Sequence, residues 1–128
     1  MLTAAKTPPL PTPLAETMRI AGERVGGARL LEVHNPYTGE VVGTVPRASV
    51  DDIRRAFAIA RAYKPRLTRY ERYEICRKAA EIIAQRATSL SDLITAECGI
   101  CKKDSLYEVG RARDVFTFAG NAALADDG

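Results

Sequence analysis

The sequence contains no run of about 18 apolar residues, the length that a membrane-spanning helix requires, so we expect no membrane partner. Residues 1–6 lack the apolar core of a secretory signal, and a proline follows at Pro8. The three cysteines are an odd number and do not suggest a disulfide framework. These absences predict a cytoplasmic protein, because reduced thiols are the rule in that compartment.

Strong charge of one sign is also missing. The 19 lysines and arginines stand against 16 aspartates and glutamates, which gives a net charge of +3. The basic residues occur as pairs, such as Arg54-Arg55 and Lys102-Lys103, and not as blocks interleaved with aromatic residues. We therefore expect solvated helix faces and no nucleic-acid partner.

The sequence lacks the usual motifs for a cofactor, a metal or a catalytic nucleophile. Neither the dinucleotide fingerprint G-x-G-x-x-G nor a phosphate loop occurs, so no cofactor-binding residue is assigned. Zinc requires three or four protein ligands, and Cys76 and His34 have no metal-type spacing. Cys76 has no histidine near it in sequence and is expected in the core, while His34 is expected to be structural or exposed. We expect no metal and no catalytic residue.

Residues 1–17 are predicted to form a flexible, proline-rich tail. They include four closely spaced prolines, which cannot join a helix or a central strand: Pro8, Pro9, Pro11 and Pro13. The remaining residues, 18–128, are numerous enough for one small folded unit.

Two short β-hairpins are predicted after the tail. In the first, residues 18–20 and 24–25 flank a turn that contains Gly22. In the second, residues 30–34 and 41–45 alternate apolar and polar side chains on either side of a turn. Asn35 can accept bonds from nearby backbone, Pro36 presets φ, and Gly39 can adopt a positive φ.

Four helices are predicted to follow: the first near residues 50–64, the second from 69, the third from 88 or 89 to about 98, and the fourth from 103 or 104. The first two begin at capping boxes, Ser49 with Asp52 and Thr68 with Glu71. Gly99 fits the left-handed position after the third. The apolar positions at helical spacing are Ile53, Phe57 and Ala60; Tyr73, Cys76, Ala80 and Ile83; Leu90, Leu93 and Ile94; and Leu106, Val109, Val115, Phe116 and Ala119.

Several segments together resemble the amino-terminal part of the aldehyde dehydrogenase superfamily. They are V-H-N-P-Y-T-G-E-V-V-G-T-V at 33–45, A-S-V-D-D-I at 48–53, E-C-G-I at 97–100 and Glu108-Val109. The resemblance implies an α/β parent fold, of which this segment is the mostly helical part with two short β-hairpins. It also implies that residues 18–128 are an incomplete piece of the cofactor-binding domain.

Within the superfamily, residues 98–111 most resemble the phosphonoacetaldehyde dehydrogenases. The resemblance implies an intact enzyme that oxidises phosphonoacetaldehyde, a small anionic aldehyde, to phosphonoacetate in phosphonate catabolism. Such an enzyme uses NAD or NADP and forms a homo-oligomer when full length. The family's catalytic cysteine and glutamate segments do not occur in these residues. We therefore expect this chain alone to be inactive and to bind no cofactor.

Arg111 is the one substrate-binding residue that the resemblance implies. It occupies the position after glutamate-valine-x where related enzymes that oxidise anionic aldehydes use an arginine on the substrate. The structural alternative is an exposed arginine that pairs with Glu108 or Tyr107 on its own helix. Arg113 is a weaker candidate because it points to a different face, and Ser105 is expected to pack near Arg111.

Two other functions remain open from the sequence. One is a stand-alone helical interaction module derived from such an enzyme, which would expose little apolar surface. The other is a small redox protein that uses Cys98 and Cys101, which form a C-x-x-C pair. Because Cys98 falls at a predicted helix end, a structural role at a helix junction is favoured over redox chemistry.

Overall fold

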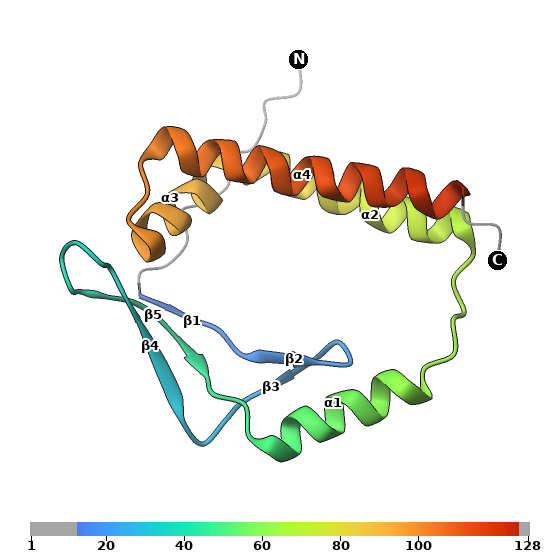
Figure 1. The fold of residues 1–128 in the computed structure, drawn as a ribbon, viewed down its shortest axis with the longest axis horizontal. Coiled ribbons are helices and arrows are strands. Elements are labelled where there is room, and N and C mark those ends of the chain that lie inside the picture. The colour runs from blue at the N-terminus through green and yellow to red at the C-terminus, as the bar shows by residue number, and fades with distance from the viewer. Residues whose placement is uncertain (1–12, 126–128) are drawn as a thin grey trace. The chain divides into compact units, whose positions relative to one another are not determined.

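The structure is a computed structural model, and it describes residues 13–125. Helices dominate and the strands are short, as the sequence predicts (Figure 1). The elements are β1 (Leu14–Ala15), β2 (Met18–Ile20), β3 (Glu23–Val25), β4 (Leu30–His34), β5 (Val41–Pro46), α1 (Val50–Ala62), α2 (Arg69–Gln85), α3 (Ala87–Cys98) and α4 (Lys102–Ala125).

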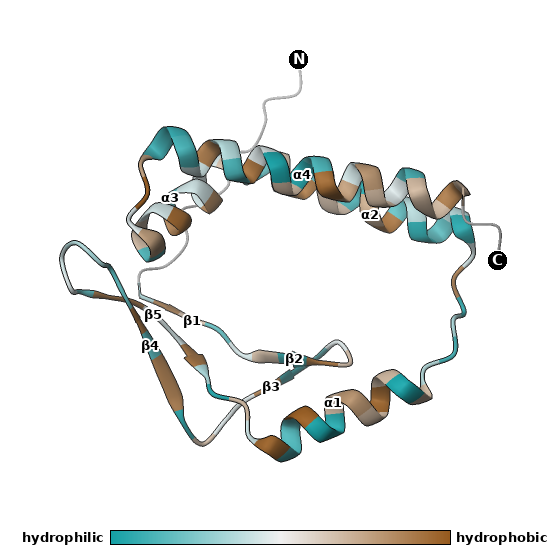
Figure 2. Cartoon of the chain, viewed as in Figure 1, coloured by the Kyte–Doolittle hydropathy of each residue, from teal (hydrophilic) through white to brown (hydrophobic). Residues whose placement is uncertain are grey.

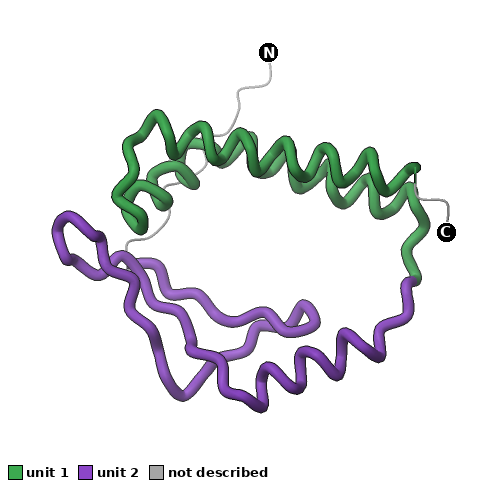
Figure 3. The backbone as a smooth tube through the Cα atoms, viewed as in Figure 1, with its two compact units in different colours: residues 1–10, 66–128 green, residues 11–65 purple. Residues whose placement is uncertain are grey.

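The described residues form two compact units, which Figure 3 distinguishes by colour. Residues up to Pro65 contain the five strands and α1, and we call them the strand unit. Residues from Arg66 onward contain α2, α3 and α4, and we call them the helical unit. The division falls after a proline that follows α1, where a helix cannot continue.

The first predicted hairpin is confirmed. Strands β2 and β3 pair antiparallel, with Met18 opposite Val25. The two residues between them, Ala21 and Gly22, have φ values of 53° and 84°. Two consecutive positive φ values are typical of the tight turn that matches the right-handed twist of paired strands. Glycine adopts this conformation without strain, whereas Ala21 does so at a cost.

The second predicted hairpin, β4 with β5, is also confirmed. The side chain of Asn35 accepts hydrogen bonds from the backbone N–H groups of Tyr37 (2.8 Å) and Thr38 (3.1 Å). The N–H of Gly39, whose φ is 74°, donates to the carbonyl of Asn35 over 2.8 Å. The turn chemistry that the sequence predicts therefore closes this hairpin.

A third strand, β1, joins this sheet and was not predicted. It pairs parallel to β5, with Leu14 opposite Gly43, and the strand order is β1-β5-β4. A Cβ atom at Gly43 would lie 2.5 Å from the Leu14 carbonyl oxygen, so the pairing requires glycine there. The prediction of a tail that reaches residue 17 is therefore wrong for Leu14 and Ala15, while residues 1–12 of that tail lie outside the described residues.

Helix α1 has a satisfied start and an uncovered apolar side. The backbone N–H of Asp52 donates to Ser49 Oγ over 3.1 Å, and the Asp52 carboxylate accepts from the Ser49 N–H over 2.9 Å. None of the helix residues is buried, and Phe57 is 74% exposed. Figure 2 shows hydrophobic residues alternating with hydrophilic ones along it. The capping box therefore fixes where α1 begins, and packing among the described residues contributes little.

The helical unit is held together by close contact of α2 with α4. Helix α2 begins at the predicted capping box, where the Glu71 N–H donates to Thr68 Oγ1 over 3.2 Å. Ala80 on α2 and Val109 on α4 are buried. At Gly120, a Cβ atom would lie only 3.3 Å from the Cβ of Cys76. Small residues therefore allow the two helices to approach closely.

Only some of the apolar residues predicted to pack on α4 are buried. Val109 is buried, but Val115 is 63% exposed and Phe116 is also exposed. The buried positions instead include Ser105 and Gly120. The prediction assigned the packing side of α4 from its large apolar residues, but small residues line the contacts of this helix.

Helix α3 begins at Ala87, one or two residues before the predicted start, and follows α2 almost directly. Its first residue is preceded by Arg86, which provides no side-chain cap. Gly99 adopts the left-handed conformation, with φ of 70°, and its N–H donates to the Thr95 carbonyl over 2.9 Å. The predicted glycine cap at the end of α3 is confirmed.

Candidate functional site

A cluster of buried hydroxyl groups joins α3 to the first turn of α4. Ser91 and Ser105 have no exposed surface, and their Oγ atoms are 2.6 Å apart. Thr95 Oγ1 donates to Ser105 Oγ over 3.0 Å, and Ser105 Oγ donates to the Lys102 carbonyl over 3.1 Å. Because Ser105 donates its only hydroxyl proton to that carbonyl, the Ser91 hydroxyl donates to Ser105 Oγ.

Lys102 adds a second connection between the same helices. Its Nζ forms an ion pair with Asp92 and donates to the Thr88 carbonyl over 3.3 Å. The ion pair is exposed and worth little by itself. Together with the hydroxyl cluster, it holds the start of α4 at a defined position on α3.

The candidate substrate residue, Arg111, lies two turns further along α4. Its side chain is 63% exposed, and one guanidinium nitrogen contacts Glu108 Oε1 over 3.2 Å. This is the pairing on its own helix that the structural alternative describes. A single-point contact leaves most of the five N–H donors of the guanidinium for another acceptor. Tyr107, one turn earlier, is also exposed.

Arg113 is engaged in a different way. Its Nε and Nη2 donate to Asp114 Oδ1 over 3.0 and 2.8 Å. It lines a groove between α2 and α4 rather than the side of α4 that carries Arg111. The structure therefore does not bring the two arginines to one site. Ser105 belongs to the buried hydroxyl cluster and packs rather than facing solvent.

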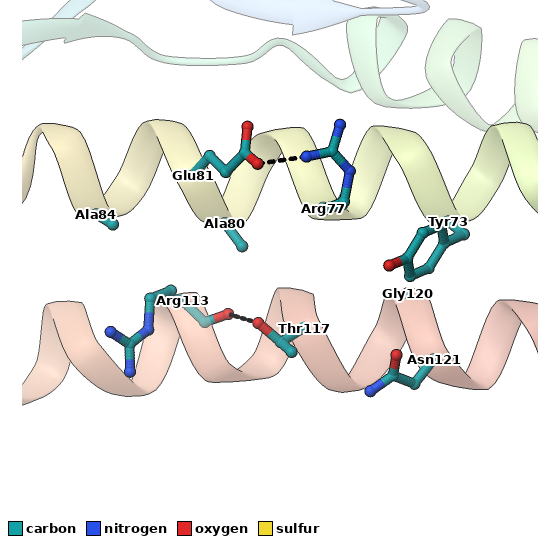
Figure 4. Close-up of a pocket in the computed structure, with 9 residues that line it drawn as sticks. All are labelled: Tyr73, Arg77, Ala80, Glu81, Ala84, Arg113, Thr117, Gly120 and Asn121. Carbon is teal, nitrogen blue, oxygen red and sulfur yellow. Dashed lines mark hydrogen bonds and ion pairs between the residues drawn. The ribbon is translucent and has the colours of Figure 1, made fainter. Parts of the chain in front are cut away.

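The groove between α2 and α4 was not predicted from the sequence. Figure 4 shows its lining: Tyr73, Arg77, Ala80, Glu81, Ala84, Arg113, Thr117, Gly120 and Asn121. The sequence signal that could have revealed it is the small residues Ala80, Ala84 and Gly120 at helical spacing on the two helices. Such residues leave space beside a close helix crossing.

The two arginines of the groove are paired with carboxylates on their own helices. Arg77 Nε and Nη2 donate to the two carboxylate oxygens of Glu74, each over 2.9 Å, and Arg77 also pairs with Glu81. The hydrogen bond with Glu74 raises the pKa of Arg77, and the same contact lowers the pKa of Glu74. These paired charges support helix structure and provide no free cation for a substrate.

The remaining sequence candidates are three cysteines in the helical unit and one histidine in the strand unit. Cys98 and Cys101 are exposed free thiols at the α3–α4 connection, and Cys76 is half-buried on α2. His34 Nδ1 is 3.0 Å from the Gly39 carbonyl oxygen, a turn contact consistent with a structural role. Within residues 13–125, no cluster of potential metal ligands occurs, and none of the helices is long and apolar enough to cross a membrane.

Comparison with known proteins identifies the fold to which these elements belong. The Aldehyde dehydrogenase family pattern matches residues 24–128. A solved NAD-dependent aldehyde dehydrogenase from Sinorhizobium meliloti superposes with a TM-score of 0.82 at 33% identity, over 89% of this chain and 24% of that one. This likeness confirms the predicted α/β parent fold.

Curated relatives show the same family. The 3-sulfolactaldehyde dehydrogenase of Priestia aryabhattai is 31% identical over 105 residues, which are 81% of this chain and 22% of that protein. The lactaldehyde dehydrogenase of Methanococcus aeolicus is 33% identical over 92 residues, 70% of this chain and 20% of that protein. The chain thus spans about a fifth of the length of these relatives. It belongs to the aldehyde dehydrogenase family and corresponds to an amino-terminal segment of such an enzyme.

Proposed function

We propose that this chain contributes to an NAD- or NADP-dependent dehydrogenase that oxidises phosphonoacetaldehyde to phosphonoacetate in phosphonate catabolism. The exposed guanidinium of Arg111 on α4 is the observation that carries the proposal. Family membership supplies the reaction class. The relative named for 3-sulfolactaldehyde supports an anionic substrate, because a sulfonate and a phosphonate are similar tetrahedral groups of oxygen atoms.

In this proposal Arg111 binds the phosphonate and leaves the aldehyde carbon free to react. Its planar guanidinium can donate two parallel hydrogen bonds to phosphonate oxygens and stays charged at any working pH. Among residues 13–125, the contact with which the substrate has to compete is the 3.2 Å hydrogen bond from Arg111 to Glu108. Tyr107 lies one turn earlier on the helix and can line the same approach.

The covalent chemistry falls to residues outside this segment. In the family reaction a cysteine thiolate attacks the aldehyde, hydride passes to the nicotinamide, and a glutamate-activated water releases the acid. We propose that residues 18–128 are the amino-terminal part of the cofactor-binding domain, that the intact enzyme is a homo-oligomer, and that it works in the cytoplasm. The chain alone is then inactive and binds no NAD.

The test uses the gene product purified from its source and a recombinant version with Arg111→Ala. A loss of about 1.5–3 kcal/mol, typical of a charged hydrogen bond, corresponds to roughly 10- to 100-fold in KM for phosphonoacetaldehyde. The KM for lactaldehyde, which has no anionic group, should change much less. Arg113→Ala is the matched control and should leave the KM for both aldehydes near the wild-type values.

An unchanged KM for phosphonoacetaldehyde in the Arg111→Ala variant would show that this arginine does not bind substrate. A gene product that oxidises lactaldehyde and ignores phosphonoacetaldehyde would refute the substrate itself. Calorimetry of the 128-residue chain with NAD tests the remaining part, since stoichiometric binding would contradict the claim that this segment holds no cofactor alone.

The stand-alone interaction module is not favoured by the structure. That alternative requires little exposed apolar surface, but Phe57 on α1 and Val115 and Phe118 on α4 are largely exposed. Apolar side chains of this kind usually mark a surface that contacts another part of a protein.

A further inference from the structure

We propose that Cys98 and Cys101 form a dithiol modification site, which a hydroperoxide converts to an intramolecular disulfide. The site is separate from the Arg111 position and does not depend on the substrate proposal. It differs from a redox enzyme in that the pair is a target of oxidation on a dehydrogenase segment. The molecule that reacts at this site is a small hydroperoxide, which acts as the oxidant.

Both thiols lie in one short connection with anchored ends. Cys98 is the last residue of α3, and Cys101 directly precedes α4. On one side the Gly99 N–H donates to the Thr95 carbonyl over 2.9 Å, and on the other the Ser105 N–H donates to the Cys101 carbonyl over 3.0 Å. Because the helices fix both ends, the two cysteines cannot drift apart as they could in a long loop.

The backbone between the thiols turns at Gly99. Gly99 has φ of 70°, a left-handed conformation that turns the chain away from the axis of α3. Only Gly99 and Ile100 separate the two cysteines, so closing the disulfide requires ordering very little chain. The hydroxyl cluster of Ser91, Thr95 and Ser105 joins the same two helices.

Exposure distinguishes this pair from the third cysteine. Cys98 and Cys101 are exposed free thiols, whereas Cys76 is half-buried on α2, with its Cβ at the close crossing beside Gly120. Reaction of a thiol with a peroxide requires access to the sulfur. The structure therefore predicts that two of the three cysteines react as a pair and that Cys76 does not.

The peroxide accepts the two electrons that disulfide formation releases. The first thiolate is that of Cys101, which lies at the amino end of α4, whereas Cys98 lies at the carboxyl end of α3. It attacks one peroxide oxygen, which forms an S–O bond, breaks the O–O bond and releases hydroxide (or, from an organic hydroperoxide, the alkoxide). The second thiolate then attacks the sulfenic sulfur, which forms the S–S bond and releases the oxygen as water after protonation. The two thiols lose two electrons together, and the peroxide is reduced to water.

The experiment treats the purified 128-residue chain with hydrogen peroxide and follows it by intact mass and by thiol counting. We expect a loss of two hydrogens and a fall from three free thiols to one, both reversed by dithiothreitol. Trypsin should release residues 87–102, which contain both Cys98 and Cys101, with the mass of an internal disulfide, because no lysine or arginine separates them. Residues 73–77, which carry Cys76, should remain reduced.

Matched variants decide the assignment. Cys76→Ser should behave as wild type and lose two thiols, whereas Cys98→Ser and Cys101→Ser should form no internal disulfide. The proposal is overturned if wild-type peptide 87–102 keeps both thiols, if it gains oxygen instead of losing hydrogen, or if the disulfides formed link two chains. A disulfide that involves Cys76 would also overturn it.

Discussion

The strand unit and the helical unit are specified in different ways. In the strand unit, each turn and helix start is fixed by groups a few residues apart, such as the Asn35 side chain and the Ser49–Asp52 box. In the helical unit, the decisive contacts join residues distant in sequence, such as Ser91 with Ser105 and Cys76 with Gly120. The comparison shows that local rules can define where elements begin without defining how helices pack.

The close crossing of α2 and α4 gives the largest expected effect. In Gly120→Leu the new side chain meets Cys76 and Tyr73 at the point of closest approach, and overpacking of this kind costs about 1–3 kcal/mol. Gly110→Leu is the matched control on the same helix, because a Cβ atom there meets nothing within 4 Å. It should stabilise the helix by about 0.5–1 kcal/mol, since glycine is a poor helix former.

Urea unfolding followed by circular dichroism at the helix wavelength measures both variants. If the two leucine substitutions shift the midpoint equally, α4 does not depend on the α2 crossing, and the contrast between the units is lost.

The buried hydroxyl cluster gives the next effect. Ser105→Ala removes the acceptor of Ser91 and Thr95, and buried polar groups left without partners cost about 1–3 kcal/mol. Ser89→Ala is the control, because Ser89 lies on α3 two residues before Ser91 and its hydroxyl donates to the Arg86 carbonyl, outside the cluster. Denaturant midpoints should fall for Ser105→Ala and change little for Ser89→Ala. Equal midpoints would show that the cluster is not what joins α3 to α4.

How much could be predicted depends, in both units, on whether a contact joins residues close in sequence or residues far apart. The capping boxes at Ser49 and Thr68 and the left-handed Gly99 were readable because their partners lie within a few residues. The pairing of β1 with β5 was not, since it depends on Gly43 meeting the Leu14 carbonyl from far along the chain. The packing side of α4 was misjudged because the buried positions carry serine and glycine rather than large apolar side chains.

The candidate site shows a similar division. A motif made Arg111 a candidate, and the structure adds that its guanidinium is exposed and contacts Glu108 through one nitrogen. The groove beside Arg113 was missed because its lining comes from two helices whose facing sides no local pattern identifies. Its charges prove to be paired, which sequence spacing alone does not establish.

A pH effect tests whether the local caps act alone. The pKa of Glu71 is lowered mainly by the hydrogen bond from the Thr68 backbone N–H, and that of Asp52 mainly by the one from the Ser49 hydroxyl. Groups whose folded pKa is lowered contribute stability above their unfolded pKa and lose it as pH falls through the folded value. Helix content should therefore decrease in acid as these carboxylates become protonated.

Glu71→Gln is the variant that isolates this effect on α2. The glutamine amide can still accept from the Thr68 N–H but cannot titrate. The urea midpoint of the variant should therefore be lower than that of wild type at neutral pH and should change less as the pH falls. If the urea midpoints of wild type and Glu71→Gln fall by the same amount between neutral and acidic pH, the cap does not contribute through its charge.

The smallest expected effect lies in the β2–β3 turn, where one residue carries the strain. Ala21 has φ of 53°, and an L-residue other than glycine, asparagine or aspartate is disfavoured in that region. Ala21→Asn places Asn-Gly at the two turn positions, the pair favoured in a tight hairpin, and should stabilise the strand unit by roughly 1 kcal/mol or less. Ala28→Asn, in the same unit outside this turn, is the control for the change of side chain. Because the strain is confined to this turn, the gain should appear as slower amide exchange in β2 and β3 and not in α2 or α4. Exchange slowed equally in both units would mean that they unfold as one, and the distinction between locally and distantly specified parts would not hold.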